Sequence, residues 1–164
     1  MDKFEVYHAG TDRIEMPDSR HGRIDLDFGR GFYLTDIYDQ TCNFALAKSR
    51  ERRRPPLINV YLLDRKSLLE EANSLIFERY NEYWLEFIVE CRSGGNIWKE
   101  YDYIEGGVAD DRVIDTVNMY IAGFISRDTA LNNLRYLKPN NQICILNQKL
   151  LDKHLKFREC IKLG

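Results

Sequence analysis

The chain has 164 residues, of which 44% are hydrophobic and 30% charged, and this composition fits one compact domain, residues 1–164, with its own core. The net charge of −2 excludes a global electrostatic attraction to nucleic acid or to an anionic membrane. The chain begins without a charged-then-apolar signal pattern, and no apolar run approaches the roughly 18 residues of a membrane span, so we expect a cytoplasmic protein with no membrane partner.

Strands and a helix alternate in the first part of the chain. Residues 4–8 (FEVYH) alternate like a strand, and a polar connection leads into a second strand at 31–35 (GFYLT). Residues 39–53 are predicted to form a helix that Pro55 ends, and the apolar run 57–63 (LINVYLL) predicts a strand buried on both faces.

The middle of the chain carries helix signals on either side of another strand. The sequence SLLE from Ser67 has the form of a capping box that opens a helix. Apolar residues at helical spacing predict an amphipathic helix at 80–92, and 101–108 (YDYIEGGV) predicts a strand. Asp110 or Asp111 is then positioned to cap a helix through 113–124.

The last part adds Ser126 as the cap of another helix, a strand at 142–146 (QICIL), a short helix, and a final strand around 155–160. Strands at the start, middle and end, with helices inserted between them, predict an α+β fold with a mixed sheet.

The four cysteines and three histidines make a metal site unexpected. Cys42, Cys91, Cys144 and Cys160 are widely spread without a C-x-x-C pair, so they are interpreted as reduced core residues. No histidine pair or Cys/His cluster has metal-ligand spacing.

Two short stretches concentrate candidate binding residues. YHAGT places His8, the bare backbone of Gly10 and the hydroxyl of Thr11 at the end of the first strand. DFGRGFYLT places two glycines beside Tyr33, which suits either a tight turn entering a strand or a site where a ligand approaches the backbone beside a ring. Taken alone, His8 and Tyr33 are each explained by a structural role.

Taken together, YHAGT, GRGFYLT and NNQIC resemble the ADP-ribosyltransferase superfamily, in the branch that includes diphtheria toxin and the poly(ADP-ribose) polymerases. In that branch three successive motifs supply histidine, tyrosine and glutamate around NAD. With YWLEFIVECR and YDYIEGGVADD added, residues 7–147 look like an uncharacterised bacterial family of small ADP-ribosyltransferase-like proteins. The resemblance implies an ADP-ribosyltransferase-like fold in which mixed β-sheets form an NAD cleft with inserted helices.

The resemblance also implies roles for individual residues. His8 would bind a ribose hydroxyl of NAD, the backbone at Gly10 would hold the nicotinamide carboxamide, and Tyr33 would stack on the nicotinamide ring beside Gly31. Thr11 and Arg30 are candidates for the diphosphate, although a solvated turn residue explains Arg30 equally well.

The third motif departs from the superfamily because Gln142 stands where glutamate is expected. An amide makes the hydrogen bond but brings no negative charge and cannot act as a general base. Loss of one preorganised electrostatic contact typically costs about 3 to 4 kcal/mol of transition-state stabilisation. Another carboxylate would therefore have to compensate, with Asp110 favoured over Asp111 and Glu105, or the acceptor needs no base; Asp110 is equally explained as a helix cap.

The basic run SRERRRPP includes Arg50, Arg52, Arg53 and Arg54. A helix C-terminus favours such cations without any partner, and contact with an acidic partner or nucleic acid is the alternative.

Three functions from different classes follow. The leading one is an NAD-dependent mono-ADP-ribosyltransferase, a bacterial toxin or defence effector that modifies a protein or nucleic acid, for which the resemblance also implies an antitoxin partner. The alternatives are a catalytically weak or inactive module that binds NAD or ADP-ribose, and an interaction domain that uses the Arg50–Arg54 run.

Overall fold

The computed structural model describes residues 3–110 and 112–164 and shows strands and helices mixed along the chain. The elements in chain order are β1 (Lys3–Gly10), β2 (Phe32–Leu34), α1 (Tyr38–Arg52), β3 (Leu57–Asp64), α2 (Arg65–Glu71), β4 (Ser74–Ile76), α3 (Glu82–Arg92), the 3₁₀ helix η1 (Ile97–Glu100), β5 (Tyr103–Gly106), α4 (Ile114–Ile121), α5 (Arg127–Leu134), β6 (Gln142–Ile145), α6 (Gln148–His154) and β7 (Leu155–Lys162). The predicted α+β class is confirmed.

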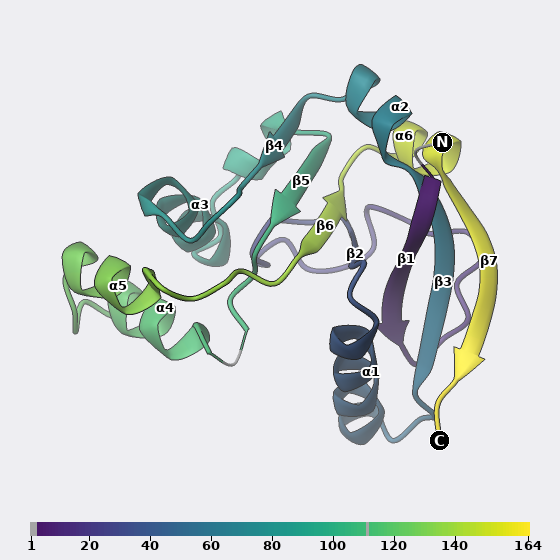
Figure 1. Cartoon of the computed structure of the whole chain (residues 1–164), viewed down its shortest axis with the longest axis horizontal. Helices are drawn as coiled ribbons and strands as arrows, with labels where there is room; N and C mark the ends of the chain where they lie inside the picture. The colour runs from purple at the N-terminus through teal and green to yellow at the C-terminus, as the bar shows by residue number, and fades with distance from the viewer. Residues whose placement is uncertain (1–2, 111) are drawn as a thin grey trace.

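The strands form two sheets that meet near the start of α1. The first sheet is antiparallel with the order β1-β3-β7, and the second is mixed with the order β2-β6-β5-β4, in which only β4 and β5 run parallel. An isolated bridge between Tyr7 and Thr35 connects β1 to the residue after β2. Figure 1 shows α1 beside β1 and β3, with α3, α4 and α5 at the far end of the second sheet.

Each face of the second sheet packs against a different layer because side chains alternate along its strands. Phe32, Leu34 and Ile143 pack with residues of the first sheet, including Val6 and Tyr61, in one buried cluster. The opposite face, which carries Tyr33, Ile104 and Cys144, packs against residues of α3, α4 and α5. A third cluster, formed by Ala45, Ile58 and Val60 with their neighbours, joins α1 to the first sheet.

Helix α3 is anchored at its first turn and along its buried face. The side chain of Asn81 accepts a hydrogen bond from the backbone N–H of Trp84 and caps the helix, which begins at Glu82, two residues later than predicted. The fully buried Trp84 ring donates from Nε1 to the carbonyl of Gly107 at 2.7 Å. This bond joins α3 to the segment that follows β5. The helical pattern of the sequence does not predict this contact.

Three local predictions at helix starts have different outcomes. Ser126 caps α5 by accepting from the N–H of Thr129 at 3.1 Å, as predicted. Helix α2 begins before Ser67, because the carboxylate of Asp64 accepts the Ser67 N–H and acts as the cap. No described side chain caps α4, where the carbonyl of Asp110 accepts the N–H of Ile114; the other predicted cap, Asp111, lies outside the described residues.

The cysteines are free in the structure, and Cys91 and Cys144 are buried. Burial raises the pKa of the Cys91 thiol to about 12, which keeps it protonated and unreactive. Within the described part of the chain, no helix is long and apolar enough to cross a membrane.

Candidate functional site

Two adjoining cavities lie where β1, β2 and α1 come together. The smaller has a volume of about 290 Å³ and the larger about 770 Å³. They share as lining residues His8, Ala9, Leu26, Tyr33 and Lys48. Both volumes fall near the range of roughly 300–1,000 Å³ that is typical of small-molecule sites.

The imidazole of His8 is held in one orientation by two contacts. Its Nδ1 lies 2.7 Å from the carbonyl oxygen of Tyr33, and its ring stacks on Phe32 with centroids 4.4 Å apart. Because a carbonyl can only accept, Nδ1 carries the proton and Nε2 keeps its lone pair. Burial, with a smaller contribution from the charges of Lys48 and Arg52, lowers the pKa of His8 to about 4, although the hydrogen bond to the Tyr33 carbonyl acts in the opposite direction. At neutral pH His8 is therefore an uncharged acceptor.

Tyr33 presents its ring to both cavities while its hydroxyl is bound elsewhere. The hydroxyl donates to the carbonyl of Gly29 at 2.6 Å and accepts from the N–H of Phe28 at 3.0 Å. Burial raises the pKa of Tyr33 well above its usual value, so the phenol stays protonated. The ring is thus a fixed wall, and its hydroxyl is a structural anchor rather than an acid or base.

The glycines near the cavities have different reasons for being glycine. A Cβ on Gly31 would lie 2.4 Å from Sγ of Cys144, and one on Gly29, where φ is +79°, would lie 2.1 Å from the Trp98 ring. Packing therefore explains both glycines of DFGRGFYLT, although Gly31 also lines the larger cavity. A Cβ on Gly10 would meet no protein atom closer than 4.0 Å, so the fold does not need a glycine there.

Gln142 lies at the first position of β6 and lines the smaller cavity together with His8 and Tyr33. Its Oε1 accepts a hydrogen bond from Nε2 of Gln40 on α1 at 3.2 Å. The structure thus brings the three motif residues to one cavity, and it adds Gln40 as a partner that orients the Gln142 amide.

The acidic residues proposed to compensate for Gln142 are engaged away from the cavities. Asp110 forms an ion pair with Arg112 at 3.0 Å and accepts from Asn140, and it lines neither cavity. Glu105 also lines neither cavity and is bound in a two-point ion pair by Arg65, at 2.8 and 3.0 Å. The prediction of Asp110 as the cleft carboxylate therefore finds no support in this geometry.

Of the described carboxylates, Asp27 is the one that lines the smaller cavity. It is 8% exposed, pairs with Arg92 from the end of α3, and accepts from the N–H of Ala109 at 2.8 Å. The sequence carried a weak signal for it, since Asp27 opens the glycine-rich stretch, but its partners lie far along the chain. The guanidinium of Arg92 holds this carboxylate in place.

The positive charges at the cavities come from α1 rather than from the glycine-rich stretch. Arg30 is partly buried and lines neither cavity, so the structure does not bring it to the site. Thr11 lines the larger cavity, where its hydroxyl accepts from Arg52 at 3.2 Å. Lys48 lines both cavities. Its pKa is lowered mainly by burial and, to a smaller extent, by repulsion from Arg52. Lys48 was missed because one lysine on a polar helix carries no signal by itself.

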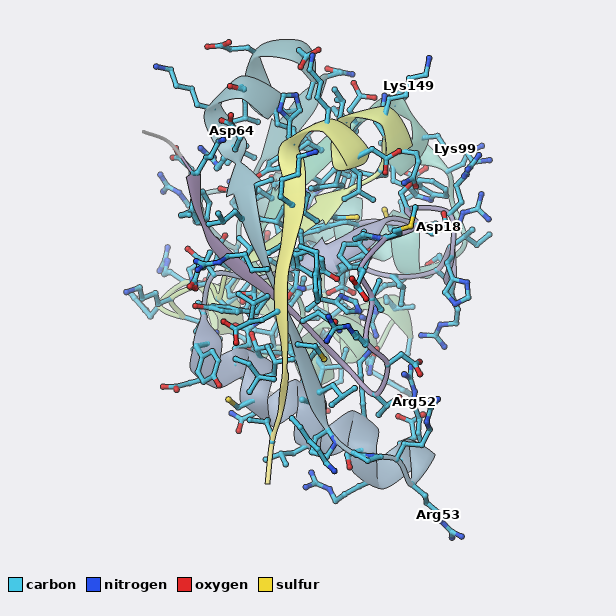
Figure 2. The ribbon with its side chains drawn as sticks, turned by 90° about the vertical axis from the view of Figure 1, so that its right-hand side faces the viewer. Asp18, Arg52, Arg53, Asp64, Lys99 and Lys149 are labelled. Carbon is cyan, nitrogen blue, oxygen red and sulfur yellow. The ribbon has the colours of Figure 1, made fainter. Side chains whose placement is uncertain are left out.

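The other arginines of the basic run have separate positions. Arg54 pairs with Asp12 at 2.7 Å, while Arg53 takes the left-handed conformation that ends α1, with φ at 55°. Figure 2 shows Arg53 extending away from the body of the molecule beyond the end of α1. Arg50 is exposed on the last turn, so the run does not form one continuous binding surface with the cavities.

Two further residues of α1 line the smaller cavity. Phe44 is 39% exposed there, and Thr41 is buried with its hydroxyl bonded to the carbonyl of Ile37. Phe44 adds to the aromatic side chains of Tyr7 and Tyr33 at this cavity. Among the described residues, no group of three or more histidine, cysteine, aspartate or glutamate side chains is placed to hold a metal ion.

The fold and site together define an α+β protein with a cleft between two sheets, lined by a neutral histidine, a tyrosine ring and a glutamine. The family model described as "Protein of unknown function (DUF3990)" matches residues 4–157, and the chain belongs to that family. No curated protein and no solved structure matches the chain.

Proposed function

We propose that this protein is an NAD-dependent mono-ADP-ribosyltransferase, a glycosyltransferase that releases nicotinamide and passes ADP-ribose to a macromolecule. The observation that carries the proposal is the meeting of His8, Tyr33 and Gln142 at one cavity from three distant segments of the chain. These are the residues at the motif positions of the superfamily that the sequence resembles.

Each side chain suits one part of the substrate. The lone pair on Nε2 of His8 accepts a hydrogen bond from a ribose hydroxyl, and it stays available at neutral pH because the pKa of His8 is about 4. The Tyr33 and Phe44 rings offer electron-rich faces to the cationic nicotinamide. The open space at Gly10 lets a carboxamide approach the backbone.

In the proposed reaction, the bond between C1′ of the ribose and the nicotinamide nitrogen breaks, and its electron pair neutralises the charge on that nitrogen. An acceptor atom forms the new bond to C1′ and loses its proton to solvent or to a base. The positive character that develops at C1′ is stabilised by nearby negative charge. In this proposal Asp27, which lines the cavity while paired with Arg92, supplies the negative charge, and the Gln142 amide held by Gln40 orients the ribose.

The acceptor class is a protein or nucleic acid, and the biological role is that of a bacterial toxin or defence effector whose activity an antitoxin protein restrains. Both parts of this role come from the sequence resemblance alone.

A module that binds NAD or ADP-ribose without turnover is the second candidate. Gln142 favours it, because the side chain at the third motif is an amide already bonded to Gln40. Calorimetry that shows NAD binding, with no nicotinamide released by the wild type or by Gln142→Glu, would establish this alternative.

Nicotinamide release from NAD labelled in its nicotinamide ring tests the proposal. Phe44→Ala should lower kcat/KM by roughly ten-fold, because an aromatic stack on a base contributes about 1–3 kcal/mol. Phe124→Ala is the matched control, since Phe124 is 80% exposed and lines neither cavity. Equal activity of the two variants would contradict stacking at Phe44, and no release by wild type or Gln142→Glu would contradict the proposed activity.

A further inference from the structure

The larger cavity has two cations of α1 on its wall, Lys48 and Arg52, and neither forms an ion pair with another of the described residues. Lys48 and Arg52 are one helical turn apart on the same face of α1. Arg52 donates to the uncharged hydroxyl of Thr11 at 3.2 Å. The nearby Arg54, by contrast, forms an ion pair with Asp12 at 2.7 Å.

The two cations act electrostatically on each other and on His8, which also lines the cavity. Arg52 lowers the pKa of Lys48 by more than Glu51 raises it. Glu51 precedes Arg52 in the chain and also lines the cavity. Both cations act on the His8 imidazole as well. Two like charges held this close repel each other, and an anion between them relieves that repulsion.

The other carboxylates that line the larger cavity do not neutralise the charges of Lys48 and Arg52, because arginines elsewhere engage them. Asp12 is taken by Arg54, and Asp18 has Arg20 beside it at 3.9 Å and accepts from the Arg20 N–H. Figure 2 shows Asp18 and Arg52 on the same side of the molecule. The hydroxyl of Thr11 and the guanidinium of Arg52 are typical donors to phosphate oxygens.

We propose that Lys48, Arg52 and Thr11 form a diphosphate-binding subsite in the larger cavity, which holds the diphosphate of a dinucleotide whose other end lies against His8 and Tyr33. The identity of the dinucleotide rests on the proposed function, whereas the anion site itself does not. This assignment replaces Arg30 as the phosphate ligand, since Arg30 lines neither cavity.

Titration calorimetry with inorganic diphosphate, with ADP-ribose and with nicotinamide tests the subsite on the full chain. Lys48→Gln and Arg52→Gln should each weaken binding of diphosphate and ADP-ribose by roughly ten- to hundred-fold, because each removes a charged hydrogen bond. Nicotinamide binding should change less than about two-fold, since it makes no phosphate contact.

Arg53→Gln is the matched control, because it removes the same charge one residue further on, from a side chain that points away from the molecule. Equal weakening by Arg52→Gln and Arg53→Gln would reduce the effect to general electrostatic attraction and overturn the subsite. Failure of the wild type to bind diphosphate would also overturn it. Lys48 and Arg52 lie outside the buried core, and a thermal unfolding scan of each variant shows whether its fold is intact.

The outcomes separate the subsite from the transferase proposal. Diphosphate and ADP-ribose binding that depends on Lys48 and Arg52, without any cleavage of NAD, supports the subsite and contradicts the proposed activity. NAD cleavage whose KM is unchanged in Lys48→Gln and Arg52→Gln supports the activity and overturns the subsite.

Discussion

The neutral state of His8 makes the stability of the folded protein depend on pH in a defined way. The pKa of His8 is about 4 in the folded chain, against 6.5 for an unperturbed histidine. Between about pH 6.5 and pH 4, His8 is protonated in the unfolded chain but neutral in the folded chain. The free energy of unfolding therefore falls as the pH drops through this interval and changes little from this cause below about pH 4. A difference of this size corresponds to about 3 kcal/mol of unfolding free energy lost between pH 7 and pH 4.

His8→Gln isolates this effect, because glutamine keeps an N–H donor for the Tyr33 carbonyl but does not titrate. Urea unfolding at pH 7 and pH 4 measures the stability of both proteins. The wild type should lose about 3 kcal/mol more than the variant over this interval. Equal losses in the two proteins, or an NMR titration of the His8 ring with a midpoint near pH 6.5, would refute the argument for a buried, neutral imidazole.

Four further substitutions test separate parts of the site. Gly31→Ala should destabilise the fold by about 1–3 kcal/mol in urea unfolding, because its Cβ would lie 2.4 Å from Sγ of Cys144. Gly10→Ala, whose Cβ meets no protein atom closer than 4.0 Å, should leave stability unchanged but weaken NAD binding measured by calorimetry. Asp27→Asn should lower the unfolding free energy by about 1.5–3 kcal/mol, since the carboxylate supports Arg92 and the Ala109 N–H; unchanged stability would show that these bonds contribute little. Gln142→Glu should raise the rate of nicotinamide release by supplying the missing negative charge, and a slower variant would contradict that role.

The sequence predicted those elements whose signals are local. The alternation of β1, the apolar run of β3 and the Ser126 cap of α5 all depend on neighbouring residues, and each was located correctly. Strand β4 was missed because Ser74–Ile76 is only three residues long and exists through its parallel pairing with β5. The start of α2 was misplaced because the capping carboxylate of Asp64 belongs to the preceding strand.

The site was predictable to a similar extent. His8, Tyr33 and Gln142 were selected as motif residues, and the structure brings them to one cavity. Asp27 and Lys48 were missed because their importance depends on contacts between distant segments, such as the pairing of Asp27 with Arg92 and the position of α1 against β1.

The central claim is the transfer of ADP-ribose to a macromolecule. Mass spectrometry of lysate proteins and nucleic acids, after incubation with this protein and isotopically labelled NAD, tests it most directly. We predict a labelled ADP-ribose group on a defined acceptor, with matching release of nicotinamide and strong loss of the product for Phe44→Ala but not for Phe124→Ala. Lysate macromolecules without label, for both the wild type and Gln142→Glu, would contradict the claim.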